Sequence, residues 1–223
     1  MSAQQELHDS AVSATKPSAD LITRAPKALL HDHLDGGVRP QTIIDLAQES
    51  GYADLPNRVP NRSDTIFATA SGGKVYVAVG ILQWIERGKL HFGDRIGDLL
   101  DFDLRGIDPE ITVEQLLTHT SGMPDYFDES VTDDYEALWT DFPNYKIRSG
   151  RDLLPLFIGK PMVEPRGERF RYNNAGYVVL GILLERLSGM PFDAYLREAV
   201  FSRCGMNSTG YYELDRLPAR CAD

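Results

Sequence analysis

Cysteine is scarce in this sequence: the 223 residues contain only Cys204 and Cys221. Two thiols make neither a disulfide framework nor a four-cysteine metal cluster, and we interpret both as ordinary reduced side chains. The N-terminus lacks the basic start and apolar core of a secretory signal, and no apolar run approaches the roughly 20 residues that span a bilayer. The sequence therefore predicts a cytoplasmic protein without a membrane partner.

Basic residues are also fewer than acidic ones. The chain has 33 Asp and Glu against 23 Lys and Arg, which gives a net charge of −10. Binding to nucleic acid or to an anionic membrane surface requires a basic face, so we expect neither partner. The hydrophobic fraction of 42% predicts a globular protein with a real core.

The first 56 residues differ in composition from the rest. Residues 1–20 are rich in Ser, Ala and Gln and predict a flexible tail. The stretch KALLHDHLDGG at 27–37 predicts a strand ending in a Gly-Gly turn, and RPQTIIDLAQESGY at 39–52 predicts a helix that begins near Pro40. A strand followed by a helix predicts the opening of a βα unit.

Beyond residue 57 the spacing of apolar residues is mostly helical. Helices are predicted at about 71–88, 111–124, 171–191 and 191–206. In the second of these, Thr112 and Gln115 form a capping-box pair, and Gly122 with Pro124 ends the helix. The third helix is closed in the same way by Gly189 and Pro191.

The stretch FATASGGKVYVAVGIL at 67–82 places Ser71 and Lys74 three residues apart, hence on one face of a helix. A serine hydroxyl becomes a nucleophile when a nearby base removes its proton, and a desolvated lysine can be that base. A helix N-terminus also favours a developing oxyanion. Gly72 and Gly73 cost helix stability and are interpreted as making room for a substrate. The alternative is a chance Ser-x-x-Lys pattern in a plain turn.

A second polar group precedes the third helix. In RYNNAGY, Tyr172 and Asn174 form a Tyr-x-Asn pattern. A phenol near a lysine can relay a proton to a leaving group, and an amide can hold a substrate carbonyl or the lysine. The alternatives are a core aromatic for Tyr172 and a helix cap for Asn174.

Residues 51–223 resemble the serine β-lactamase, penicillin-binding protein and esterase superfamily. The resemblance rests on the two motifs above together with DRIGDLLDF, ITVEQLLTHTSGMPDY and PRGERFRYNNAGYVVLGILLERLSGMPFDAYLREAVF, which occur in the family's order. It implies that Ser71 is acylated, Lys74 is its base, Tyr172 relays protons and Asn174 supports them. It also implies a structural role for His119. No cofactor is implied, and the partner is a small-molecule substrate.

Two departures from the family pattern affect the expected fold. The family carries a Lys/His-x-Gly motif on a later strand, and the chain reaches Asp223 without one. The family's first strands are also replaced. We therefore expect an α/β protein with an incomplete β-lactamase/transpeptidase-like fold, a helical part with few strands, C-terminally truncated and preceded by a βα fragment. Unpaired edges would favour self-association.

The N-terminal fragment contains a pair of histidines. His31 and His33, at i and i+2, share one face of the predicted strand with Asp35, and this set could bind zinc. The alternative is a surface pair. APKALLHDHLDGGVRPQTIIDLAQESGY resembles the first βα unit of the adenosine deaminase family, a zinc-dependent barrel; the resemblance implies zinc binding by the histidines and sugar contact by Asp35. The family's other ligands and catalytic Glu have no match, so no functional metal is expected.

Three functions follow from these patterns. The first is a serine hydrolase that forms an acyl-enzyme on Ser71 with a small ester, amide or β-lactam. The others are a catalytically inactive truncated or chimeric protein, and a zinc-dependent deaminase remnant that lacks residues it would need. The predicted divisions are a tail at 1–20, a deaminase-like fragment at 21–56 and a β-lactamase-like domain at 57–223. The two resemblances meet at GYADLP, residues 51–56, which predicts a junction there.

Overall fold

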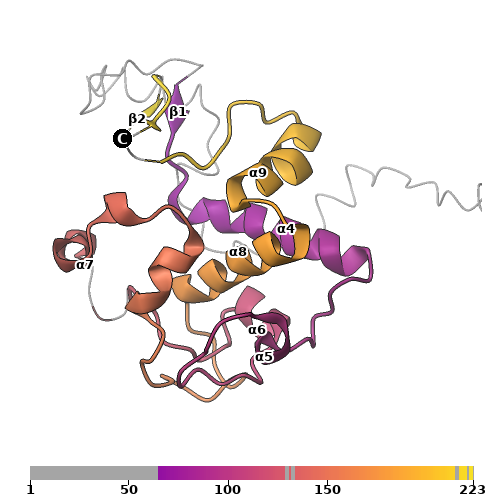
Figure 1. The fold of residues 1–223 in the computed structure, drawn as a ribbon, viewed down its shortest axis with the longest axis vertical. Helices are drawn as coiled ribbons and strands as arrows, with labels where there is room; N and C mark the ends of the chain where they lie inside the picture. Colours follow the sequence, from indigo (N-terminus) through magenta and orange to yellow (C-terminus); the bar gives the residue numbers. More distant parts are fainter. Residues whose placement is uncertain (1–64, 129–130, 132–133, 214–215, 220, 223) are drawn as a thin grey trace, which may run out of the picture. The chain divides into compact units, whose positions relative to one another are not determined.

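The computed structural model describes residues 65–128, 131, 134–213, 216–219 and 221–222. The predicted tail, the βα fragment with its strand and helix, and the junction lie outside these residues. The described part is mostly helical with two short strands, as expected for the helical portion of the fold (Figure 1). Its elements are β1 (Ile66–Phe67), η1 (Ala70–Gly73), α4 (Lys74–Glu86), α5 (Ile96–Leu99), α6 (Val113–Leu117), α7 (Tyr135–Asp141), η2 (Asn144–Lys146), η3 (Gly150–Leu156), α8 (Asn174–Ser188), α9 (Phe192–Leu196), η4 (Arg197–Phe201), η5 (Ser202–Cys204) and β2 (Cys221–Ala222).

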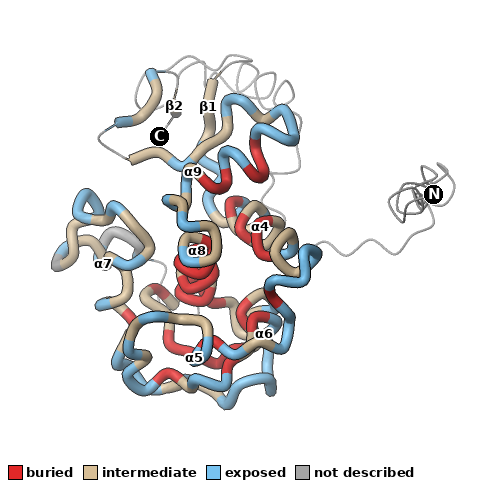
Figure 2. The backbone as a smooth tube through the Cα atoms, turned by 45° about the vertical axis from the view of Figure 1, so that its right-hand side comes forward, coloured by how far each residue is buried: buried red, intermediate tan, exposed pale blue. Residues whose placement is uncertain are grey.

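Helix α8 lies at the centre of this part and is buried along most of its length (Figure 2). The Asn173 side chain caps its start by accepting a hydrogen bond from the Gly176 N–H at 2.7 Å. Gly189, with φ 68°, ends it in the left-handed conformation that glycine adopts without strain. The apolar face includes Val179, Leu180 and Leu183, each 1% exposed or less. The predicted end at Gly189 is confirmed, whereas the helix begins at Asn174 and not near residue 171, with Asn173 and not Asn174 as its cap.

Helix α4 packs against α8 and α9. At the crossing, a Cβ added to Gly80 would lie 3.0 Å from Leu184 Cδ1 and 3.2 Å from Tyr195 Cε1, so the absence of a side chain permits the close approach. Ile81 is fully buried on this face. On the other side of α4, Val75 and Leu82 are 61% and 44% exposed. The helix thus buries one apolar face and leaves a second one open among the described residues.

The predicted short helix and the C-terminal helix are both present, but the short helix ends at Leu117, before the stop predicted at Gly122 and Pro124. The capping box of α6 is confirmed, because Thr112 Oγ1 accepts from the Gln115 N–H at 3.3 Å and Gln115 Oε1 accepts from the Thr112 N–H at 3.0 Å. The segment predicted as one helix at 191–206 is divided into α9, the π-helical η4 and the 3-10 turn η5.

The two described strands pair in parallel, with Ile66 opposite Cys221 and Phe67 opposite Ala222. Strand β2 was not predicted, since its two residues are too few to show an alternating pattern. The pairing places the start of the nucleophile segment beside a segment about 150 residues later in the chain, a separation at which local sequence patterns carry no information.

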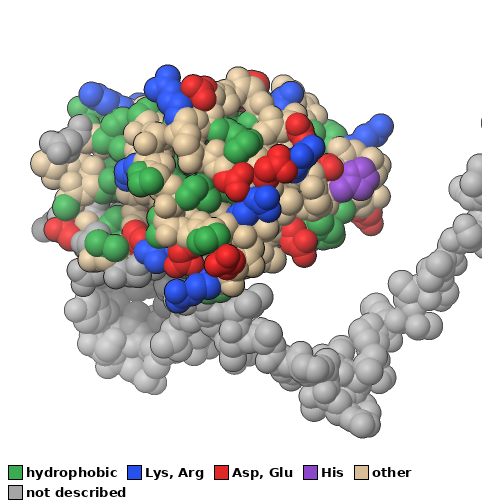
Figure 3. Space-filling model, turned by 90° about the horizontal axis from the view of Figure 1, so that it is seen from below, with side chains coloured by type: hydrophobic (Ala, Val, Ile, Leu, Met, Phe, Trp, Pro, Cys, Tyr) green, Lys and Arg blue, Asp and Glu red, His purple; other side chains and the backbone are tan. Residues whose placement is uncertain are grey.

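The surface carries mixed charge. On the face seen in Figure 3, acidic and basic side chains of the described residues are interspersed, and no large basic area lies there. Among the described residues, no single helix is long and apolar enough to cross a membrane; α8 together with the segment Phe192–Cys204 reaches the necessary length and composition only as a pair bent by 78°.

Candidate active site

Ser71 and Lys74 lie where the chain enters α4. Ser71 is in the 3-10 turn η1, and Lys74 is the first residue of α4. The Lys74 Nζ atom is 3.0 Å from Ser71 Oγ, within hydrogen-bond distance. The 13-residue helix α4 directs its N-terminal end, the positive end of its dipole, toward this pair. A nucleophile and a base candidate are thus adjacent at a position that favours negative charge.

Tyr172 and Asn174 approach the same pair from the start of α8. The Tyr172 hydroxyl donates to Ser71 Oγ at 2.7 Å. Lys74 Nζ donates to Asn174 Oδ1 at 2.9 Å and lies 4.8 Å from the centre of the Tyr172 ring. Lys74 and Tyr172 therefore both contact the Ser71 oxygen, and Asn174 contacts Lys74, although about 100 residues separate the two motifs.

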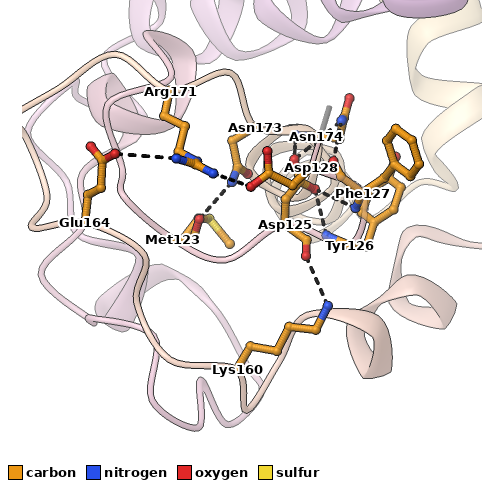
Figure 4. A network of polar contacts seen from close by, with 10 residues as sticks. All are labelled: Met123, Asp125, Tyr126, Phe127, Asp128, Lys160, Glu164, Arg171, Asn173 and Asn174. Atoms are coloured by element: carbon orange, nitrogen blue, oxygen red, sulfur yellow. Dashed lines mark hydrogen bonds and ion pairs between the residues drawn. The ribbon is translucent and has the colours of Figure 1, made fainter. Parts of the chain in front are cut away.

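Asn174 rests on Asp125, in the loop that follows α6 (Figure 4). The carboxylate of Asp125 accepts from the backbone N–H groups of Asn174 at 2.6 Å and Ala175 at 3.0 Å, at the N-terminus of α8. Burial raises the pKa of Asp125, and hydrogen bonds from these and neighbouring backbone N–H groups act in the opposite direction. The loop therefore contacts the start of α8, which carries Asn174, through the largely buried carboxyl group of Asp125.

The imidazole ring of His119 packs against the ring of Tyr172. Its Nδ1 accepts from the Asn173 N–H at 3.1 Å, and its ring lies 4.6 Å from the Tyr172 ring and 5.0 Å from the Tyr177 ring. Burial, followed by the charge of Lys74, lowers the pKa of His119 from its usual 6.5 to about 4. The imidazole is therefore neutral at pH 7 and packs as a structural element, as the family resemblance implies.

This environment makes stability pH-dependent. The unfolded chain binds a proton at His119 near pH 6.5 and the folded chain only near pH 4, so the free energy of unfolding falls as the pH is lowered through that window. We expect His119 to contribute a loss on the order of 2 kcal/mol, allowing for its partial exposure.

The matched variant is His119→Asn. Asparagine tolerates the φ of 57° at this position and can still accept from the Asn173 N–H. Urea unfolding of both proteins at pH 7, 5.5 and 4 gives the comparison. The difference between their pH slopes isolates His119, because Asp125 is common to both; equal slopes would contradict the assignment.

The two glycines of the motif have different surroundings. A Cβ at Gly73 would lie 2.9 Å from the hydroxyl oxygen of Tyr211, which donates to the Gly73 carbonyl at 2.9 Å. A Cβ at Gly72 would meet only Thr69, at an ordinary 3.7 Å. Tyr211 therefore lies beside Gly73, and Gly73 is also one of the residues that line the cavity described below. For both glycines the room-making interpretation stays a prediction.

A cavity of about 690 Å³ adjoins the base and the amide. Its lining includes Lys74 and Asn174, apolar residues such as Val77 and Phe192, and charged residues, namely Arg148, Glu185, Asp193, Arg197, Glu213 and Arg216. Burial raises the pKa of Tyr211, another wall residue, to about 12, while 37% of that residue remains exposed. A cavity lined by both apolar side chains and polar groups suits a small molecule.

Sequence reasoning missed Asp125 and Tyr211. Asp125 follows Pro124 in a turn, where aspartate is common for local reasons, and Tyr211 lies in a segment without periodic pattern. His31, His33 and Asp35 lie outside the described residues. Within the described ranges, no group of three or more His, Cys, Asp or Glu side chains could hold a metal ion.

Comparisons with known proteins agree with both resemblances. The family model described as Beta-lactamase matches residues 28–223. Penicillin-binding protein 4* of Bacillus subtilis strain 168 is 30% identical over 174 residues, covering 76% of this chain and 36% of that protein. The crystal structure of a penicillin-binding protein from Bacillus halodurans has a TM-score of 0.71 at 48% identity and covers 76% of this chain and 51% of that one.

Adenosine deaminase 1 of Streptomyces coelicolor is 59% identical over 61 residues, 27% of this chain and 15% of that protein. The short match confirms the deaminase-like fragment. The Beta-lactamase match begins at residue 28, inside the range predicted for that fragment, so the boundary at residue 56 stays a prediction. This chain spans between a third and about half of the penicillin-binding relatives described above, at 36% and 51% of their lengths.

Proposed function

This chain belongs to the Beta-lactamase family, and on that basis we propose that it is a serine hydrolase that forms an acyl-enzyme on Ser71 with a small ester, amide or β-lactam. One observation carries the proposal: Ser71 Oγ lies within hydrogen-bond distance of both Lys74 Nζ, at 3.0 Å, and Tyr172 Oη, at 2.7 Å. A nucleophile with a base and an acid on the same oxygen suits acyl transfer.

The proposed reaction begins once the Lys74 amine has lost its proton: Nζ then takes the Ser71 hydroxyl proton as Oγ attacks the substrate carbonyl. The Oγ–carbon bond forms, and the tetrahedral oxyanion develops near the N-terminus of α4. Tyr172 donates its proton to the leaving group as the bond to that group breaks, and recovers a proton from Lys74. Water then hydrolyses the ester by the reverse sequence. The reaction uses side chains of this chain and no metal or cofactor.

The substrate class is tested with three acyl donors: a p-nitrophenyl ester, an amino-acid amide and benzylpenicillin. The proposal predicts an adduct of the acyl group's mass on the intact protein with at least one of them, together with release of the leaving group. Ser71→Ala is the control, and it should form no adduct. Turnover that persists in Ser71→Ala would contradict the assignment of the nucleophile.

A further inference from the structure

We propose that Asp125 is a positioning residue that fixes the direction of the Asn174 side-chain amide, so that the amide oxygen and not its nitrogen faces Lys74. The inference rests on the proposed function and names a group on which that function depends. Among the described residues, Asp125 makes no hydrogen bond or ion pair with Ser71 or Lys74; it acts through Asn174.

The Asp125 carboxylate is surrounded by donors on both sides. Its Oδ1 atom accepts from the backbone N–H groups of Tyr126 at 2.7 Å, Ala175 at 3.0 Å and Phe127 at 3.4 Å. Its Oδ2 atom accepts from the Asn174 backbone N–H at 2.6 Å and from Asn174 Nδ2 at 3.4 Å. Both oxygens are therefore engaged, and a carboxylate is the side chain that accepts at two oxygens without donating.

The surroundings of Asn174 determine the orientation of its side-chain amide. The Nδ2 atom lies between two pure acceptors, Asp125 Oδ2 at 3.4 Å and the Phe127 carbonyl at 3.2 Å. The residue is only 7% exposed, so water cannot compensate freely for a wrong orientation. A flipped amide would place Oδ1 against two acceptors and leave buried groups unpaired. The oxygen is thereby directed at Lys74 Nζ, which donates to it at 2.9 Å.

The orientation matters for the chemistry of Lys74. A neutral primary amine has two N–H groups and one lone pair, and the lone pair must be available to take the Ser71 proton. An amide oxygen engages one N–H of the amine and leaves the lone pair free. An amide nitrogen at the same place would donate to that lone pair and compete with the Ser71 hydroxyl. Asp125, together with the Phe127 carbonyl, therefore keeps the Asn174 amide in the orientation that lets Lys74 act as a base toward Ser71.

Asp125 is itself held firmly. Lys160 Nζ donates to its backbone carbonyl at 3.2 Å, and the neighbouring Asp128 forms an ion pair with Arg171, which also pairs with Glu164 at 3.6 Å (Figure 4). The Lys160 contact holds the backbone at Asp125, whereas Asp128 pairs with Arg171 and, among the described residues, makes no hydrogen bond to the Asn174 amide. Asp128 therefore offers a control in the same loop that removes an ion pair without contact to the Asn174 amide.

The decisive variant is Asp125→Asn, which keeps the shape but has one acceptor and one donor. Whichever way its amide turns, a donor faces either the Tyr126 and Ala175 N–H groups or the backbone N–H and side-chain NH2 of Asn174. The measurement is labelling of the full chain by a fluorophosphonate, followed by intact mass to give kinact and KI. We expect kinact to fall about 10²-fold, with KI within about twofold, because base geometry and not binding is disturbed.

A double-mutant cycle separates positioning from a general loss of structure. In an Asn174→Ala background, Asp125→Asn should lower kinact by less than about threefold, because the amide on which it acts is absent. Asp128→Asn should leave kinact within about threefold of the wild type. An equal loss from Asp125→Asn in both backgrounds, or a wild-type kinact in a folded Asp125→Asn variant, would overturn the inference.

A second measurement decides the matter if Asp125→Asn does not fold or if the wild type is not labelled. The side-chain NH2 signal of Asn174, assigned by its loss in Asn174→Ala, should show NOEs to Phe127 in the wild type and slow exchange with solvent. NOEs to the Lys74 Hε protons instead would overturn the inference. Failure of wild-type labelling with the expected NOEs would contradict the proposed function alone.

Discussion

Replacing Lys74 with methionine is expected to lower the rate of Ser71 labelling by a fluorophosphonate about 10³-fold. Methionine keeps the length and apolar stem of the side chain but cannot accept a proton. Proton abstraction by a positioned base contributes roughly 10²–10⁴-fold to such reactions. The expected loss lies within that range because Lys74 Nζ is the amine within 3.0 Å of the serine oxygen. The ratio of kinact to KI, measured by intact mass, gives the effect.

Lys74→Arg is the matched control. It preserves the positive charge but not the proton-accepting role, because a guanidinium stays protonated in proteins and is planar. We expect it to be as slow as Lys74→Met. Recovery of labelling in Lys74→Arg would show that charge alone activates Ser71, and labelling of Lys74→Met within tenfold of the wild type would show that Lys74 is not the base.

Gly122→Ala is expected to lower the free energy of unfolding by about 3 kcal/mol or more. Gly122 has φ 65°, and a Cβ there would lie 2.1 Å from the Glu164 carbonyl oxygen. Its own carbonyl accepts from the N–H groups of Val163 at 2.9 Å and Glu164 at 3.2 Å. Because the atoms that the new Cβ would meet are backbone atoms of Glu164 and Pro165, a side-chain rotation cannot relieve the clash. Urea unfolding at pH 7 measures the loss.

Gly205→Ala separates the clash from backbone strain. Gly205 has a similar φ of 68°, but apart from its chain neighbours no described residue has an atom within 4 Å of the position its Cβ would take. Only the left-handed conformation is penalised there, at about 1 kcal/mol. A loss in Gly122→Ala no larger than that in Gly205→Ala would mean that the chain segments at Gly122 and Glu164 separate easily.

The local features of this fold were predictable because each depends on only a few neighbouring residues. The Thr112 and Gln115 capping box, the Gly189 end of α8 and the placement of Ser71 and Lys74 at the start of a helix all depend on short-range geometry. The pairing of Ser71 with Tyr172 spans about 100 residues, and family resemblance, not periodicity, anticipated it.

Other features could not be read because they depend on distant partners. Asp125 resembles an ordinary turn residue until its carboxylate is seen against the start of α8. The need for glycine at position 73 comes from Tyr211, which lies 138 residues away in sequence. Strand β2 has two residues and is defined only by its pairing with β1. In each case the physical cause is a tertiary contact that local propensity does not encode.

The central claim is that Ser71 is an activated nucleophile, and one measurement tests it most directly. The full chain is incubated with a fluorophosphonate, its intact mass is recorded, and the adduct is located by peptide mapping, with Ser71→Ala in parallel. The account predicts one adduct, on Ser71, that is absent from the variant. A folded wild-type protein without an adduct, or an adduct that persists in Ser71→Ala, would contradict it.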